Sequence, residues 1–473
     1  MMQKVHLMGI CGMAMGSLAA MLNAEGCELR GSDQHVYPPM SDQLAELGIV
    51  YTEGFQGANL DWGPDLVVVG NVITRRNPEA LALQERGLPY TSLPKLIAER
   101  FIGDRHAVVV TGTHGKTTTS GLLAWVLKQS GRDPAFLVGG VLKNFNASYG
   151  LGKGKHFVIE GDEYDTAYFD KVPKFVHYRP TSGLITSIEF DHADIYEDLS
   201  RIKQEFGKFV DLIPEDGLLT ACIDDPNVCD VIQGTDVPVQ TYGFSPAAEW
   251  TLDDIHVGTP YTRFCIRHKG NIFGTFETPM IGRHNLLNML GASALLHGLG
   301  LSPEEISTGF RSFQGVTRRQ ELRGIVNDIV VLDDFAHHPT AVRLTIEAVR
   351  SHYFAETGRI GRLWSVFEPR SATSRRDIFQ QDYVKAFLAS DAVVIAAVHL
   401  PEKAPEGHRF SPTKLIRQLQ EHKVNARHIA DVDSIVEDLA EKTRPGDVVL
   451  IMSNGGFGDI HHKLLHALQS QVL

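Results

Sequence analysis

Cysteine is scarce in this chain of 473 residues, and the few cysteines show no pattern of a shared site. The five are Cys11, Cys27, Cys222, Cys229 and Cys265. Their number is odd and no Cys-x-x-Cys pair occurs, so the sequence indicates neither a disulfide framework nor a cysteine zinc site. This usage is typical of a protein of the reducing cytosol.

Long hydrophobic runs and an excess of basic residues are also missing. No run of about 18 apolar residues occurs, and the N-terminus has no signal-peptide pattern. The 45 Lys and Arg are outnumbered by 57 Asp and Glu, which gives a net charge of -12. This balance argues against a general nucleic-acid binder or a membrane-surface protein. We therefore expect a cytoplasmic protein with neither nucleic-acid nor membrane partners.

The remaining composition is that of an ordinary globular protein, with 43% hydrophobic and 22% charged residues. The length predicts about two to four domains. The sequence leaves the oligomeric state open between monomer and dimer.

Residues 108–119 carry the clearest chemical signal. The valine run 108–110 predicts a buried strand, a Gly-rich loop follows, and an apolar helix comes next. Strand, Gly-rich loop, Lys-Thr and helix form a phosphate-binding loop, whose backbone N–H groups surround a polyphosphate. Lys116 can bridge the outer phosphates, and the Thr117 hydroxyl can ligate magnesium. The full motif would have glycine in place of Val110, so a chance turn is the alternative.

Two later predicted strands end in acidic clusters. Strand 156–159 runs into Glu160, and strand 183–188 runs into Glu-Phe-Asp-His-Ala-Asp, which contains His192. A carboxylate at a strand end is suited to hold magnesium in a phosphate-loop fold. His192 lies between two aspartates, where it can ligate a metal. A solvated acidic loop and a structural histidine are the alternatives.

The first segment predicts a Rossmann-type start. Strand 4–8 is followed by Gly9, Gly12 and Gly16, an apolar helix to about residue 23, and a strand that ends at Asp33. A tight glycine turn with an acid about 20 residues later binds dinucleotides. The glycine spacing departs from G-x-G-x-x-G, so NAD is not favoured, and a ligand-free turn is an equal alternative. Residues 89–105 are expected to end this domain as a linker.

The middle segment is expected to finish with antiparallel strands and a helix. Residues 241–281 alternate in polarity as short edge strands do. A long apolar helix then starts at about 282 and contains Asn285 and Asn288, with plain helix capping by Asn285 as an alternative to a ligand role. A hinge at 315–321 follows a second helix with a capping box at Ser302.

The last segment alternates strands with helices again. The strands at 329–332, 363–367, 392–396 and 448–452 end in polar loops. Because parallel strands share one edge, these loops would form a second binding face. Arg370 can pair with a carboxylate through two hydrogen bonds, and the turn 453–456 can offer backbone N–H groups to another.

Over the whole chain these motifs resemble the Mur ligases and their folylpolyglutamate synthetase relatives. The likeness is carried by Thr-Gly-Thr-His-Gly-Lys-Thr-Thr-Thr, Gly-Ile-Cys-Gly-x-x-Met-Gly, Tyr-Pro-Pro-Met-Ser at 37–41, Asp-His-x-Asp and Asp-Phe-Ala-His-His-Pro. It implies an α/β protein of three domains. These are a Rossmann-like UDP-sugar domain at 1–105, a P-loop ATPase domain with a mainly parallel sheet at 106–315, and a Rossmann-like peptide-binding domain at 316–473.

The resemblance also implies the site residues. The UDP-sugar site would consist of Gly9, Ile10, Gly12, Met13, Gly16, Asp33, Asn71 and Thr74. The ATP site would consist of Gly112, Thr113, His114, Gly115, Lys116, Thr117, Thr118, Asn285, Asn288, Arg319 and Asp334. The catalytic residues would be Lys116, Glu160, His192 and Arg319, with magnesium held by Thr117, Glu160 and His192. The peptide would contact His338, Arg370, Ser453 and Asn454. Many relatives carry a carbamylated lysine, whose position here, near Gly207 and Lys208, is left open.

Within the family, three markers are most similar to ligases that join UDP-N-acetylmuramate to L-alanyl-γ-D-glutamyl-meso-diaminopimelate in murein recycling. The markers are the segments 189–194, 368–373 and 453–461. We expect ATP-dependent amide formation through an acyl phosphate, with Mg²⁺. The alternatives are a UDP-N-acetylmuramate–L-alanine ligase of de novo peptidoglycan synthesis, an NAD-linked oxidoreductase, and a P-loop regulatory ATPase that does not ligate.

Overall fold

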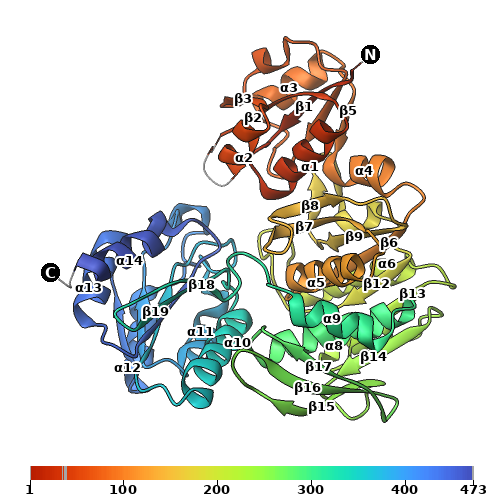
Figure 1. Ribbon diagram of the computed structural model, residues 1–473. Coiled ribbons are helices and arrows are strands. Elements are labelled where there is room, and N and C mark those ends of the chain that lie inside the picture. Colours follow the sequence, from red (N-terminus) through yellow and green to blue (C-terminus); the bar gives the residue numbers. More distant parts are fainter. Residues whose placement is uncertain (1, 35, 37–39, 471–473) are drawn as a thin grey trace.

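The computed structural model describes residues 2–34, 36 and 40–470, and within these the strands form four sheets. The three larger sheets follow one another along the chain and form the cores of three α/β domains (Figure 1). The α/β, three-domain fold class predicted from the sequence is confirmed. The Tyr-Pro-Pro part of the 37–41 motif lies outside the described residues.

The N-terminal domain is a parallel sheet in the order β3-β2-β1-β4-β5. Its main elements are β1 Lys4–Met8, α1 Met13–Ala24, β2 Glu28–Asp33, α2 Met40–Glu46, β3 Val50–Glu53, β4 Leu66–Val69, α3 Pro78–Glu85 and β5 Tyr90–Ser92. The chain order reverses at β1, so the glycine turn after β1 and the loop after β4 are neighbours. Ligands bind at such a reversal.

Residues 89–105 are not a linker, and this part of the prediction was wrong. They form β5, the helix α4 Leu93–Ile97 and a π-helical turn at Ala98–Ile102. Leu96, Ile97 and Phe101 are buried in a hydrophobic core that includes residues of the next domain. Their apolar side chains need this packing, which makes the segment part of the domain interface.

The central domain contains a ten-stranded sheet in the order β17-β16-β15-β14-β13-β12-β6-β9-β7-β8. Its first part comprises β6 His106–Thr111, α5 Lys116–Gln129, β7 Ala135–Leu142, β8 Ala147–Leu151, β9 His156–Gly161, β12 Ser182–Ile185, α6 Leu199–Asp211, β13 Leu218–Cys222, α7 Pro226–Ile232 and β14 Val239–Gly243. The predicted antiparallel edge is β15 Trp250–His256, β16 Thr262–His268 and β17 Asn271–Thr278, followed by α8 Arg283–Gly298 and α9 Pro303–Ser312. The valine run 108–110 is fully buried in β6, so the phosphate loop starts from the sheet's interior.

The C-terminal domain has a six-stranded sheet in the order β18-β19-β23-β20-β21-β22, parallel except for β18. Its elements are β18 Glu321–Val326, β19 Ile329–Asp334, α10 Pro339–Arg350, β20 Leu363–Phe367, α11 Gln380–Phe387, β21 Ala392–Ile395, α12 Pro412–Glu421, β22 Asn425–His428, α13 Val432–Lys442, β23 Val448–Met452 and α14 Ile460–Ser470. The carboxyl ends of β19, β23, β20 and β21 therefore share one edge.

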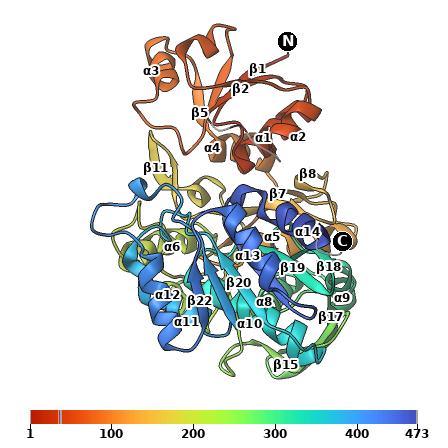
Figure 2. The same cartoon turned by 90° about the vertical axis from the view of Figure 1, so that its left-hand side faces the viewer.

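The central domain contacts both others. The Oγ atoms of Ser17 in α1 and Ser148 in β8 are 2.6 Å apart, and the Lys95 ammonium lies 2.9 Å from Asp170. On the other side, the Thr373 hydroxyl donates to Asp191 at 2.6 Å. Figure 2 shows the C-terminal domain lying against the central domain, with the N-terminal domain above both. No helix of the described residues is long and apolar enough to span a membrane.

Candidate active site

A cleft of about 1010 Å³ lies where the three domains meet. Its lining combines the glycine turn and Asp33 of the first domain, the phosphate loop of the second, and the loop after β19 of the third. Residues of all three domains therefore face one shared cleft.

The phosphate loop connects β6 to α5 and depends on two glycines. Gly112 and Gly115 have φ values of 129° and 81°, a region that other residues rarely adopt. A Cβ on Gly112 would collide with Thr186, and one on Gly115 would lie 2.6 Å from Asn288 Oδ1. Helix α5 begins at Lys116, ahead of the apolar segment from which the helix was predicted. Its N-terminus faces the cleft, which Lys116 lines. This geometry suits a polyphosphate.

The predicted strand 183–188 ends early, at Ile185, because the next residues support the phosphate loop. The Thr186 hydroxyl donates to the carbonyl of His114 at 2.5 Å, and Thr113 N donates to the carbonyl of Ser187 at 2.8 Å. Backbone groups that would extend β12 are used to shape the loop instead.

Glu163 is a buried residue that our sequence reasoning missed. Its carboxylate lies 3.0 Å from the Lys116 ammonium and 3.4 Å from His192 Nε2, and its side chain is 3% exposed. Burial pushes the pKa of Glu163 up, but the Lys116 charge, together with the hydrogen bond and charge of His192, leaves that pKa below its usual range. Glu163 therefore holds Lys116 and His192 together. Its only sequence signal is its place in the acidic cluster 160–165, which gives no way to rank one acid above another.

His192 is held in a charged state by this pairing. Burial alone would lower the pKa of His192, but its hydrogen bond and ion pair with Glu163 raise that pKa to about 8. Its backbone φ of 52° is in the left-handed region, which adds strain at a site-forming residue.

Glu160 contacts the phosphate loop directly. It lies in β9, where it accepts hydrogen bonds from the Thr117 hydroxyl at 3.1 Å and from the backbone N–H of Gly139. Burial, together with the charge of Asp162, raises the pKa of Glu160. A carboxylate in this position would be stabilised by a divalent cation, so Thr117 and Glu160 fit Mg²⁺. His192 contacts Glu163 rather than this pair.

The other predicted ATP residues line the same cleft. Arg319 lies over the Phe335 ring, 4.9 Å from its centroid, and burial lowers the pKa of its guanidinium. Asp334 is buried and accepts backbone N–H groups from Gln320 and Ala336. Asn285 does not cap α8, so the alternative of helix capping does not hold. Gly282 is the N-cap, and the Asn285 amide donates to Ile281 and Gln320.

The predicted UDP-sugar residues divide into two groups. The cleft is lined by Gly9, Gly12, Met13, Asp33 and Asn71. By contrast, Ile10 is fully buried, Gly16 packs on Met40, and Thr74 is exposed outside the lining. The Asp33 carboxylate accepts a hydrogen bond from Cys11 N at 2.8 Å, which ties the acid to the glycine turn.

Three of the four predicted peptide residues lie at one edge of the C-terminal sheet. Glu368 links Arg370 and Ser453, because its carboxylate lies 3.6 Å from the Arg370 guanidinium and accepts from the Ser453 hydroxyl at 2.5 Å. Gly455 N donates to the Ser453 hydroxyl at 2.9 Å, so this N–H is used inside the turn. The buried Asn454 Oδ1 has no hydrogen-bond partner among the described residues. His338 lies elsewhere, against the central domain.

Lys208, near which a modified lysine was considered, lies on α6. Its ammonium donates to both carboxylate oxygens of Glu205, and it is not part of the cleft lining. Its position gives no support to a modified lysine at the site.

Comparisons with known proteins give a consistent result along the whole chain. Residues 4–103 match the Mur ligase family catalytic domain, residues 110–296 the Mur ligase middle domain, and residues 318–455 the Mur ligase glutamate ligase domain. The chain is 38% identical, over 99% of both sequences, to the UDP-N-acetylmuramate–L-alanyl-gamma-D-glutamyl-meso-2,6-diaminoheptandioate ligase of Escherichia coli K12.

Two further proteins are similar to this chain over nearly its full length. The UDP-N-acetylmuramate–L-alanine ligase of Geotalea uraniireducens is 31% identical, over 99% of both sequences. The crystal structure of a murein peptide ligase from Psychrobacter arcticus 273-4 aligns with a TM-score of 0.74 and 34% identity, over 98% of both chains.

Proposed function

The chain belongs to the Mur ligase family, and from this premise we infer that it joins UDP-N-acetylmuramate to L-alanyl-γ-D-glutamyl-meso-diaminopimelate in an ATP-dependent reaction. The observation that carries this inference is the 38% identity, over full length, to a ligase of that substrate pair, against 31% to an L-alanine ligase. Diaminopimelate and 2,6-diaminoheptanedioate are the same compound. The family resemblance in the sequence is confirmed, and the oxidoreductase and regulatory alternatives do not hold.

The reaction forms one amide bond at the expense of ATP. The muramate carboxylate attacks the γ-phosphorus of ATP, the bond to the bridging oxygen breaks, and ADP leaves. The resulting acyl phosphate is attacked at its carbonyl carbon by the free α-amine of the peptide. Phosphate leaves, and the amine loses one proton as the amide forms.

The chain's own residues supply charge and position. Lys116 lies at the N-terminus of α5, where its ammonium can offset charge that develops on the transferred phosphate. Glu163 holds that ammonium in place before ATP arrives. Thr117 and Glu160 would hold Mg²⁺, with His192 close by. When bound, the ion neutralises phosphate charge.

We assign one substrate to each domain, because residues of all three domains line the cleft. Residues 1–105 would bind the UDP-sugar, residues 106–315 ATP, and residues 316–473 the peptide. These boundaries stay a prediction. We place the reaction in the cytoplasm on the cysteine usage of the chain, and its partners are small molecules.

The chemistry of the peptide supports the choice of tripeptide over L-alanine. At neutral pH the tripeptide has three carboxylates and a distal ammonium, whereas L-alanine offers one carboxylate and a methyl group beside the reacting amine. Arg370 and the unpartnered Asn454 oxygen provide complementary groups away from the phosphate loop. Measurement of phosphate release with each acceptor, in the presence of UDP-N-acetylmuramate and ATP, tests this choice.

A further inference from the structure

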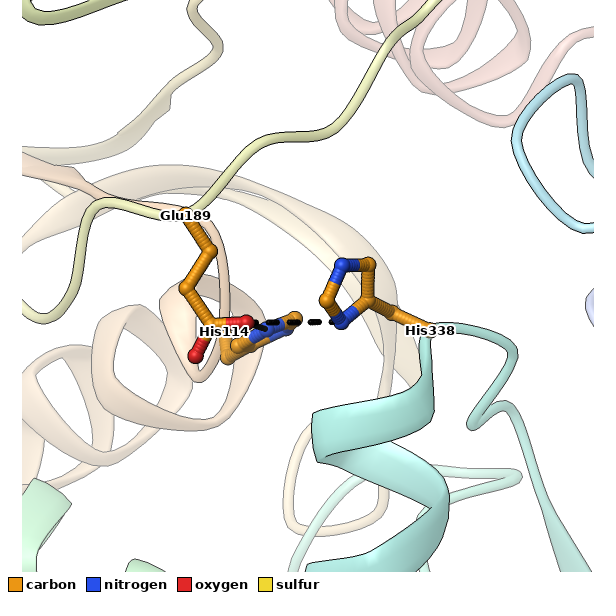
Figure 3. A group of neighbouring side chains, drawn as sticks. All are labelled: His114, Glu189 and His338. Atoms are coloured by element: carbon orange, nitrogen blue, oxygen red, sulfur yellow. Dashed lines mark hydrogen bonds and ion pairs between the residues drawn. The ribbon is translucent and has the colours of Figure 1, made fainter. Parts of the chain in front are cut away.

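Three side chains that can bind a metal converge where the phosphate loop meets the C-terminal domain. Figure 3 shows His114 and His338 on either side of the Glu189 carboxylate, with a nitrogen of each ring facing it. His114 belongs to the phosphate loop, Glu189 to the loop after β12, and His338 is the N-cap of α10. We call these residues the His114–Glu189–His338 cluster. It is separate from Thr117 and Glu160, the pair suited to magnesium.

The spacing of the ligand atoms agrees with a tetrahedral ion. Glu189 Oε2 lies 3.3 Å from His114 Nε2 and 3.5 Å from His338 Nδ1. Ligand atoms about 2.0–2.1 Å from a zinc ion, at tetrahedral angles, are separated from one another by about 3.3–3.4 Å. All three ligand atoms lie within 4.8 Å of one another, so small side-chain rotations complete the geometry.

The tautomer of His338 also suits a metal. His338 Nε2 lies 3.2 Å from the carbonyl of Phe190, which places the proton on Nε2 and leaves Nδ1, 3.5 Å from Glu189 Oε2, as an acceptor. Such a contact on the far nitrogen is typical of metal-binding histidines.

The hydroxyl and the backbone N–H of Thr340 compete with a metal for two of the ligand atoms. Its hydroxyl donates to Glu189 Oε2 at 2.7 Å, and its backbone N–H donates to His338 Nδ1 at 3.3 Å. The hydroxyl bond can remain when Glu189 binds a metal, because a carboxylate oxygen has two lone pairs. The N–H contact is long and would be given up.

We propose that the His114–Glu189–His338 cluster binds a zinc-class transition-metal ion with two imidazoles, one carboxylate and an open fourth position. Imidazole ligands favour such ions over magnesium, which prefers oxygen. Because the ligands come from the central and C-terminal domains, the ion would join the phosphate loop to α10. It would also fix His114 inside the loop that ATP must enter, so zinc should inhibit turnover. Only this last consequence rests on the proposed ligase function.

The test measures metal binding to the full chain without any substrate. Zn²⁺ is titrated against a chromophoric chelator, with wild type, Glu189→Gln and His338→Ala compared. We expect one tight site in wild type and an affinity at least 10–100-fold lower in each variant. His408→Ala, an exposed histidine of the same domain, is the matched control and should bind as wild type. Unchanged affinity in Glu189→Gln and His338→Ala, or loss of the site in His192→Ala instead, would overturn the proposal.

A second measurement needs no variant and covers the case in which a variant fails to fold. Co²⁺ bound to wild type should give the intense visible absorption of a tetrahedral ion, and one equivalent of Zn²⁺ should abolish it. Weak octahedral absorption, or no cobalt binding, would contradict the proposal. Neither result bears on whether the enzyme ligates its peptide, so the metal site and the ligase function are judged separately.

Discussion

Lys116 is the residue on which the chemistry depends most. We predict that Lys116→Ala leaves the fold intact and lowers turnover by about 10²–10³, because one charge contact made in the transition state is worth about 3–4 kcal/mol. Steady-state phosphate release measures the loss. Lys128→Ala, on the same helix but exposed and paired with Asp133, is the matched control and should keep wild-type turnover. Near-wild-type turnover in a folded Lys116→Ala protein would remove the phosphate loop from the mechanism.

Glu160 and His192 are expected to differ in their effect on magnesium. We predict that Glu160→Ala raises the Mg²⁺ concentration needed for half-maximal turnover more than His192→Ala does. A carboxylate oxygen is the harder ligand, and Glu160 contacts the Thr117 hydroxyl, whereas His192 contacts Glu163. Magnesium titrations of both variants decide this. If neither titration shifts, both residues are structural.

The sequence predicts some residues of the site and does not predict others, and the difference has a physical reason. The Gly-Lys-Thr pattern identifies Lys116 and Thr117 because their roles follow from local backbone geometry. Glu163 and the position of His338 depend on contacts between residues far apart in the chain, such as the 3.2 Å contact of His338 with Phe190. A single sequence carries no measure of those contacts.

Strand β9 contains a buried histidine whose burial lowers the stability of the folded chain in acid. His156 is fully buried, and neither ring nitrogen has a hydrogen-bond partner among the described residues. Burial, with the nearby charges of His106, Lys155 and Arg132, lowers the pKa of His156 from 6.5 to about 4. Below pH 6.5 the unfolded chain binds a proton that the folded chain does not. Stability is therefore fully present above pH 6.5 and falls as pH decreases toward 4, by on the order of 3 kcal/mol.

We predict that His156→Leu weakens this acid sensitivity. Thermal unfolding is measured at pH 8 and pH 5 for wild type and variant. The variant should lose less stability between the two values, because it has no imidazole to protonate. His256→Gln, an exposed histidine, serves as the control and should follow wild type. An identical pH dependence in His156→Leu and wild type would show that His156 does not titrate as argued.

A strand or helix can be predicted from its own residues when their pattern reflects burial. The valine-rich strands β6 and β23 and the capping box at α9 are as predicted, because buried apolar runs and caps are local signals. By contrast, β18 and β22 were not predicted. They are edge strands of mixed composition, held by pairing with β19 and β21. Their pairing partners, rather than their own residues, determine their structure.

In the whole molecule, we expect the C-terminal domain to select the amine substrate. We predict that Arg370→Ala weakens tripeptide use by about 2–5 kcal/mol, as loss of a desolvated charge pair does, while use of ATP and UDP-N-acetylmuramate changes little. Steady-state kinetics with each substrate varied in turn provide the measurement. Arg417→Ala, an exposed arginine on α12, is the control. An equal loss for every substrate would mean that Arg370 serves domain closure instead.

We propose above that this ligase takes a tripeptide rather than a single amino acid. The most direct measurement is the rate of phosphate release by wild type with ATP, Mg²⁺ and UDP-N-acetylmuramate, when L-alanyl-γ-D-glutamyl-meso-diaminopimelate or L-alanine is the acceptor. We expect rapid release with the tripeptide that depends on UDP-N-acetylmuramate, and release with L-alanine close to the rate without an acceptor. Efficient ligation of L-alanine, with little release in the presence of the tripeptide, would contradict it.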